Sequence, residues 1–343
     1  MDLELIKARS RVVQLMRRWF DDQGFTEMLT PRLVGLPGQE PYLEPFWTRL
    51  RQGSGGQADR DAALITSPEY AMKRLLAAGL DRIYDLGPCF RNGEPWDGTH
   101  DPEFLMIEWY RRDAGLTELM DDTENMIRYV ADQIKNAGDG IPDSKFQVPI
   151  SSFRRMTVEE AWRRYAGLEL GSLLEDREAL SKIAQEKFGQ TVASQDDWDD
   201  IYFKIFLSAI EDRLGEQPTF LYRYPASQAA LARRSADDPR WAERVELYVG
   251  SFELANGFAE LCDSKEQRQR FLEERELKSG QGKKTWALDE RFLSDLPRMG
   301  NAAGIAFGVD RLAMLLTGAG SINDILPFPA RERFRPLTEN KKA

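Results

Sequence analysis

The 343-residue sequence predicts an α+β protein, built either as one large domain or as about two smaller units. Segments with the spacing of amphipathic helices alternate with extended runs rich in β-branched and aromatic residues, and two pairs of these runs have the form of hairpins. Hydrophobic residues make up 42% of the chain and charged residues 30%, a balance typical of a folded enzyme. A sizeable hydrophobic core is therefore expected.

The predicted elements follow a clear order. They are a helix over 3–22, a strand over 25–33, a loop over 51–61, a helix over 68–78, a hairpin of 83–92 with 104–112, a helix over 117–136, a helical insertion over about 157–214, strands over 219–227 and 244–261, a helix over 264–279, and a strand that passes into a helix over 304–318.

Local signals justify the boundaries of these elements. Gly24 ends the first helix, and Pro31, which has no amide proton, places its strand at a sheet margin or an interface. Ser67 suits the N-cap and Pro68 the first turn of the next helix. The polar residues 331–343 are expected to form a C-terminal tail that frays.

Charge and rare residue types exclude several kinds of site. With 47 Lys plus Arg against 57 Asp plus Glu, the formal charge of −10 argues against a protein that coats nucleic acid. Cys89 and Cys262 are the only cysteines and His100 is the only histidine, so disulfide frameworks and multi-histidine metal sites are excluded. No signal peptide or membrane span is expected, and a reducing cytoplasmic compartment is. Chemistry should therefore depend on carboxylates, arginines and lysines.

A hairpin within 244–261 places two carboxylates close together. If Gly250 and Ser251 form a two-residue turn, Tyr248 faces Glu253, and Glu246 becomes a diagonal neighbour of Glu253 on the same face. Such a pair suits a hard divalent cation such as Mg²⁺ on nucleotide phosphates, or it is simply a solvated strand face.

Further carboxylates lie among large apolar residues. Asn256, Phe258 and Glu260 alternate, and they share the face of Glu253 only if the strand bulges near Gly257. Glu108 and Tyr110 share a face of another strand. Buried carboxylates need a cation, which is either a lysine-like ammonium or a structural arginine. Arg91 and Arg311, each where a strand ends, suit phosphate or carboxylate oxygens, or surface ion pairs.

Taken together, these segments resemble class II aminoacyl-tRNA synthetases of the lysyl branch. Residues 25–33 are similar to motif 1, residues 89–111 to motif 2, and residues 304–315, with Arg311, to motif 3. The resemblance implies a mostly antiparallel sheet of six or seven strands flanked by helices, in a catalytic domain over 1–330. It also implies a homodimer formed through the motif 1 region.

Within that branch the chain resembles the elongation factor P lysine ligases, which modify a protein. The first helix is expected to begin at residue 3, so no anticodon-binding domain is expected before it, and Ala306 stands where the synthetases typically have glycine. The resemblance implies ATP as cosubstrate, lysine or (R)-β-lysine as substrate, and a lysine of elongation factor P as acceptor. A tRNA acceptor and a membrane partner are not expected.

The resemblance also implies roles for individual residues. Arg91 and Arg311 would be catalytic and Glu246 and Glu253 would hold Mg²⁺. The ATP site would comprise Arg91, Glu94, His100, Phe104, Glu246, Glu253 and Arg311. The pocket for the lysine substrate would comprise Ser67, Glu69, Glu108, Tyr110, Asn256, Phe258, Glu260 and Ala306. Motif 2 departs from the family pattern, with Gly93 in place of glutamate, Glu94 one position later, one extra residue and no arginine before His100.

The implied reaction has two steps, activation of the amino acid as an acyl-adenylate and transfer to an amine. Two other functions are compatible with the same residues. A minimal lysyl-tRNA synthetase would use the same chemistry on tRNA, and a catalytically inactive regulator would bind lysine or nucleotide without reaction. An asparagine synthetase-like enzyme is disfavoured by Glu108 and Glu260. Formation of the adenylate separates the enzymes from the regulator.

Overall fold

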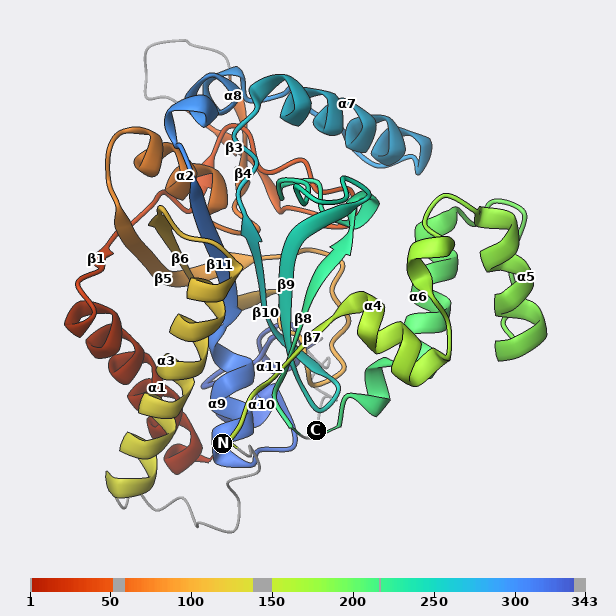
Figure 1. Cartoon of the computed structure of the whole chain (residues 1–343). Helices are drawn as coiled ribbons and strands as arrows, with labels where there is room; N and C mark the ends of the chain where they lie inside the picture. The colour runs from red at the N-terminus through yellow and green to blue at the C-terminus, as the bar shows by residue number, and fades with distance from the viewer. Residues whose placement is uncertain (1, 52–58, 138–149, 216, 336–343) are drawn as a thin grey trace, which may run out of the picture.

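An eight-stranded sheet forms the centre of the molecule (Figure 1). The computed structural model describes residues 2–51, 59–137, 150–215 and 217–335. The strand order in this sheet is β1-β5-β6-β11-β10-β9-β8-β7. The strands are β1 (Thr26–Glu27), β5 (Arg82–Phe90), β6 (Glu103–Arg112), β11 (Ala302–Gly308), β10 (Phe252–Ala259), β9 (Trp241–Val249), β8 (Thr219–Pro225) and β7 (Arg154–Thr157).

The α+β fold class is confirmed, and the number of strands is larger than expected. The six central strands are antiparallel to their neighbours, whereas β1 pairs with β5 and β7 pairs with β8 in parallel. The two short parallel edge strands raise the expected six or seven strands to eight. Pro31 follows β1 at the sheet edge, as its missing amide proton predicted.

Helices cover both faces of the sheet (Figure 1). Helices α1, α3 and α9 pack on one face over the largest hydrophobic cluster, and α2, α7 and α8 surround a smaller cluster on the other. The helices are α1 (Leu3–Asp22), α2 (Glu69–Ala77), α3 (Leu116–Ala137), α4 (Val158–Ala161), α5 (Arg177–Phe188), α6 (Trp198–Ala209), α7 (Ser264–Gly280), α8 (Glu290–Asp295), α9 (Val309–Thr317), α10 (Ile322–Ile325) and α11 (Ala330–Arg333).

The helices expected over 3–22, 68–78, 117–136 and 264–279 are present, with small shifts at their ends. Helix α2 begins at Glu69, one residue later than Ser67 and Pro68 indicated, and the Glu69 amide lies 3.4 Å from Ser67 Oγ. Most of the loop expected over 51–61 lies outside the described residues. Its last part begins strand β4 (Arg60–Leu64), which forms a three-stranded sheet with β2 (Leu33–Val34) and β3 (Trp47–Leu50).

Between β7 and β8 the chain folds into helices that protrude from the body, at the right of Figure 1. This segment contains α4, a π-helical turn (Trp162–Ala166), α5 and α6. Its core is built around Trp162 and Tyr202, whose rings lie 4.8 Å apart, and it continues onto residues of β8 and β9. The insertion therefore packs on the far end of the sheet from β5 and β6.

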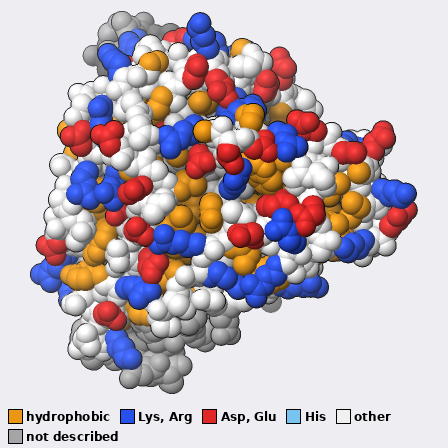
Figure 2. Space-filling model, in the orientation of Figure 1, with side chains coloured by type: hydrophobic (Ala, Val, Ile, Leu, Met, Phe, Trp, Pro, Cys, Tyr) orange, Lys and Arg blue, Asp and Glu red, His pale blue; other side chains and the backbone are white. Residues whose placement is uncertain are grey.

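The surface and the chain end complete the description. On the face shown in Figure 2, acidic and basic side chains are interspersed, and Lys and Arg side chains gather along the lower edge toward the protruding lobe. At the C-terminus, residues 330–333 form α11, whereas residues 336–343 of the expected tail lie outside the described residues. In the part of the chain that is described, no helix is long and apolar enough to cross a membrane.

Candidate active site

Strand register gathers the predicted site residues into two rows on one face of the sheet. The first row crosses four strands as Glu108, Ala306, Asn256 and Glu246, each the Cα partner of the next. The second row, two residues along, reads Tyr110, Gly304, Phe258 and Arg244. The intervening residues on the opposite face, such as Trp109, Ile305 and Phe307, are buried under α1, α3 and α9.

A β-bulge allows Glu253 to join the same face. The two-residue turn is as predicted, with Val249 opposite Phe252 and Tyr248 opposite Glu253. The register then shifts between Glu253 and Ala255, so that Ala255 faces Leu247 and Asn256 faces Glu246. The bulge was expected near Gly257, and that position is wrong. Because the bulge adds one residue after Glu253, Asn256 lies on the same face of the sheet as Glu253 and Glu246.

One end of this face holds a buried ion-pair cluster. Lys73 of α2 binds Glu69 one helical turn earlier, and its Nζ lies 2.6 Å from Glu260 Oε2. Lys73 is 1% exposed and Glu260 2% exposed. Glu260 Oε1 has no hydrogen-bond partner among the described residues. The cation expected beside the buried carboxylates is therefore a lysine of the chain and not an arginine.

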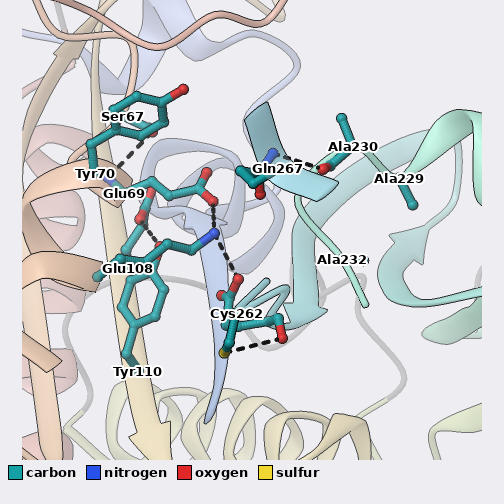
Figure 3. A network of polar contacts seen from close by, with 12 residues as sticks. Ser67, Glu69, Tyr70, Glu108, Tyr110, Ala229, Ala230, Ala232, Cys262 and Gln267 are labelled. Carbon is teal, nitrogen blue, oxygen red and sulfur yellow. Dashed lines mark hydrogen bonds and ion pairs between the residues drawn. The ribbon is translucent and has the colours of Figure 1, made fainter. Parts of the chain in front are cut away.

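Glu108 and Tyr110 lie beside this cluster. Tyr110 Oη donates to Glu108 Oε2 at 2.8 Å, and Figure 3 shows Glu108 and Tyr110 beside Glu69. The ring of Tyr110 crosses Gly304 so closely that a Cβ there would lie 2.1 Å from Tyr110 Cε1 and 2.9 Å from Glu260 Oε1. Gly304 thus leaves the space that the tyrosine and the carboxylate fill.

The charges of this cluster are coupled. Burial and the charge of Glu69 raise the pKa of Glu108 to about 8. Burial and Glu69 also raise the pKa of Glu260 to about 8, although Lys73 opposes the shift. Burial would lower the pKa of Lys73, but the carboxylates of Glu260 and Glu69 outweigh it and raise that pKa. The pocket is therefore suited to receive additional positive charge.

Arg91 directly follows β5. Its guanidinium carbon lies 5.1 Å from the centre of the Phe104 ring. Arg91 Nε is buried and has no hydrogen-bond partner among the described residues. An arginine held on an aromatic ring with a free donor is prepared to bind an anion.

Glu246 and Glu253 form a second acidic pair. Glu246 accepts hydrogen bonds from Tyr224 and Arg244 and, at 2.7 Å, from Tyr248. Burial and the charge of Glu246 raise the pKa of Glu253 to about 7. Two neighbouring carboxylates are a donor set that fits Mg²⁺, which commonly takes one or two protein carboxylates and completes its shell with phosphates and water. No group of three or more His, Cys, Asp or Glu with metal-binding geometry occurs in the described part.

The remaining residues expected at the nucleotide meet near the beginnings of β10 and α9. Arg311 Nη1 donates to the Glu253 carbonyl at 2.6 Å, and Arg311 Nη2 lies 3.0 Å from His100 Nε2. Glu94 Oε2 is 3.9 Å from His100 Nε2. The structure thus brings Glu94, His100 and Arg311 together, although motif 2 departs from the family pattern.

Several residues of this face were missed from the sequence. Lys73 could have been suspected, because it lies four residues after Glu69 on a predicted helix. Arg244, which binds Glu246 and lies 3.2 Å from Asn256 Oδ1 through Nε, gave no local signal. Glu40 also lies near the site, and burial together with the charge of Glu69 raises its pKa.

Comparisons with known proteins agree with this geometry. The family model of class II tRNA synthetases (D, K and N) matches residues 3–332. The chain is 37% identical over 324 residues to a protein of Proteus mirabilis named elongation factor P--(R)-beta-lysine ligase, covering 94% of this chain and 93% of that protein. Proteins of the same name from Photorhabdus laumondii and Erwinia tasmaniensis are 37% and 36% identical, each over 93% of both chains. The resemblance inferred from the motifs is confirmed, and the chain belongs to the class II tRNA synthetase family (D, K and N), together with these ligases.

Proposed function

We propose that this protein is an ATP-dependent ligase that activates (R)-β-lysine or lysine as an acyl-adenylate and transfers it to the ε-amino group of a lysine on elongation factor P. The similarity to the three ligases named for this reaction supports the proposal. The site supports it independently, because its charges match those of a diamino acid.

The observation that best supports the proposal is the net charge of the buried ion-pair cluster. When ionised, Glu69, Glu108 and Glu260 oppose the single ammonium of Lys73, which leaves two negative charges. Lysine and β-lysine each carry two ammonium groups. The unpartnered Glu260 Oε1 and Arg91 Nε supply an acceptor for an ammonium and a donor for a carboxylate. Ala306 lies between Glu108 and Asn256 in the row, where its methyl group would restrict how the substrate chain fits.

The proposed reaction starts when the substrate carboxylate attacks the α-phosphorus of ATP, forming the mixed anhydride and releasing pyrophosphate. Arg91 would hold the carboxylate and the α-phosphate, and Arg311, with His100, would hold the γ-phosphate. Fixed cations of this kind stabilise the charge that spreads over the phosphate oxygens in the transition state. Phe104 and Glu94 would contact the base.

In the second step a neutral lysine amine of the acceptor attacks the carbonyl carbon of the anhydride, and AMP leaves. Ser67 and Glu69 would orient the substrate through its nearer amino group, and Tyr110 and Phe258 would enclose its methylene chain. No covalent bond to the protein is required. Mg²⁺, held by Glu246 and Glu253, would neutralise phosphate charge when bound.

The finer expectations about assembly and location belong to the same proposal. We expect a homodimer through the motif 1 region, where Leu29 is 83% exposed and Leu33 43% exposed. We also expect a cytoplasmic location, in keeping with two free cysteines.

The test is the intact mass of elongation factor P from the same source after incubation with this protein, ATP, Mg²⁺ and either (R)-β-lysine or α-lysine. We expect a gain of one lysyl residue, faster with the β isomer, and none without ATP. Amino-acid-dependent pyrophosphate exchange without modification would move the acceptor to tRNA or another protein. Absence of exchange would favour the inactive regulator.

A further inference from the structure

The motif 2 loop, defined here as residues 91–103, is fastened to the C-terminal segment 321–334. The Gly98 carbonyl accepts from the Ile322 amide at 2.7 Å and from Ser321 Oγ at 3.1 Å. Gly98 has φ +97°, and a Cβ there would lie 2.9 Å from Ser321 Oγ. Glycine is thus needed at the first fastening point for both its backbone angle and its size.

The second fastening point is Asp101, which is 2% exposed. Its carboxylate accepts from the Ala330 amide at 2.6 Å and from Arg333 Nη2 at 2.7 Å. Arg333 Nη1 donates to Glu103 Oε2 at 2.6 Å. A single guanidinium therefore joins α11 to two carboxylates that lie two residues apart at the end of the loop.

These contacts flank the residues that meet the nucleotide. His100, directly before Asp101, lies 3.0 Å from Arg311, and Phe104, directly after Glu103, lies under Arg91. A loop held at Gly98, Asp101 and Glu103 keeps both His100 and Phe104 in place. The loop lacks the arginine that the family pattern has before His100, and Arg333 reaches the same loop from the other end of the chain.

We propose that Arg333 is a positioning residue for ATP, which holds the motif 2 loop so that His100 and Phe104 face the nucleotide. Arg333 acts through Asp101 and Glu103 and not by contact with the reacting atoms. The inference rests on the proposed function only in taking the nucleotide to be ATP, and it is independent of the acceptor.

The test compares Arg333→Met with Arg331→Met. Arg331 lies on the same helix, is exposed, and has no side-chain hydrogen bond or ion pair in the described structure. MgATP affinity is measured by calorimetry, and KM for ATP, KM for lysine and kcat by pyrophosphate exchange. We expect Arg333→Met to weaken ATP binding about tenfold, the effect of ~1.4 kcal/mol, while KM for lysine stays unchanged. Arg331→Met should match the unmodified protein, and Arg333→Lys should recover part of the affinity.

The outcomes separate this inference from the proposed function. Unchanged ATP affinity in Arg333→Met would overturn the inference, as would a lower melting temperature with unchanged KM for ATP, which indicates a structural role alone. If the protein without substitutions binds ATP and performs exchange but does not modify elongation factor P, the proposed acceptor is wrong. The Arg333 comparison then remains valid. Failure of the unmodified protein to bind ATP would overturn both.

Discussion

The proposed amino-acid end and the proposed phosphate end of the candidate active site are built in different ways. At the amino-acid end, Glu108, Ala306, Asn256 and Phe258 are fixed by hydrogen-bonded strand register in the middle of an eight-stranded sheet. At the phosphate end, His100 lies on a loop that is held by side chains and by a distant segment. Strand register leaves the side chains little freedom to move, whereas the position of a loop depends on each contact that holds it.

Stability and ATP use therefore depend on different parts of the site. The amino-acid end buries three carboxylates and one lysine and so combines substrate recognition with a risk to stability. The phosphate end leaves its arginines and histidine partly accessible, so its residues can change with less effect on folding. Changes at the first end should therefore affect stability and lysine recognition together, and changes at the second should affect ATP use alone.

Removal of Lys73 should have the largest effect on stability. Lys73→Met leaves Glu69 and Glu260 buried without their cation, and we expect a loss of roughly 3–5 kcal/mol in the free energy of unfolding. Urea denaturation measures this loss. Lys7→Met, which removes an exposed ion pair with Glu4, is the control and should leave the free energy of unfolding nearly unchanged. A Lys73 variant as stable as its control would show that the cluster is not held by charge.

Removal of Arg91 should have the largest effect on catalysis. We expect Arg91→Ala to lose about 3–4 kcal/mol of transition-state stabilisation, roughly a hundredfold to a thousandfold in kcat/KM, because no other group replaces its contact with the developing charge. Pyrophosphate exchange measures the loss, and the melting temperature should change little. Near-normal exchange would refute the assigned role, and Arg331→Ala serves as the exposed control.

A methyl group at Gly304 should affect the amino-acid end of the site and leave the phosphate end unchanged. Gly304→Ala places a Cβ 2.1 Å from Tyr110 Cε1, which we expect to cost roughly 1–3 kcal/mol of stability and to raise KM for lysine while KM for ATP stays the same. Gly320→Ala, where a Cβ would meet nothing within 4 Å, is the matched control. Equal changes in both KM values would mean that the two ends are not separable.

A further expected effect is on the pH dependence of stability. Burial and Glu69 raise the pKa of Glu108 from its ordinary value of 4.5 to about 8. The folded protein thus holds this proton more tightly than the unfolded chain does. The resulting stabilisation is fully present below pH 4.5 and is lost as pH rises to about 8. The free energy of unfolding should fall across that interval.

Glu108 should also affect lysine binding, but with the opposite pH dependence, because a bound ammonium favours the ionised carboxylates. We expect lysine affinity to rise with pH toward 8 and binding to release protons. Calorimetry in two buffers with different ionisation enthalpies measures the release. Glu108→Gln should reduce it, and proton release that is unchanged in this variant would exclude Glu108 as its source.

The sequence predicted the elements of this protein well because their signals are local. Helical spacing marked the helices, a Gly250 and Ser251 turn set the pairing of Tyr248 with Glu253, and Pro31 marked the sheet edge. The three motifs then indicated the family, which the comparisons confirmed. Each of these signals spans a few residues, so it can be recognised without knowledge of the fold.

Only the tertiary structure decided how these elements meet. The bulge after Glu253 shifts two strands by one residue, and such a shift moves every later side chain to the other face, which periodicity alone does not reveal. The ion pair of Lys73 with Glu260 and that of Arg333 with Asp101 join residues far apart in the chain. Partners of this kind are chosen by packing in three dimensions. Local sequence signals therefore specify the elements and the chemistry that they carry, whereas the folded sheet specifies which charges face one another.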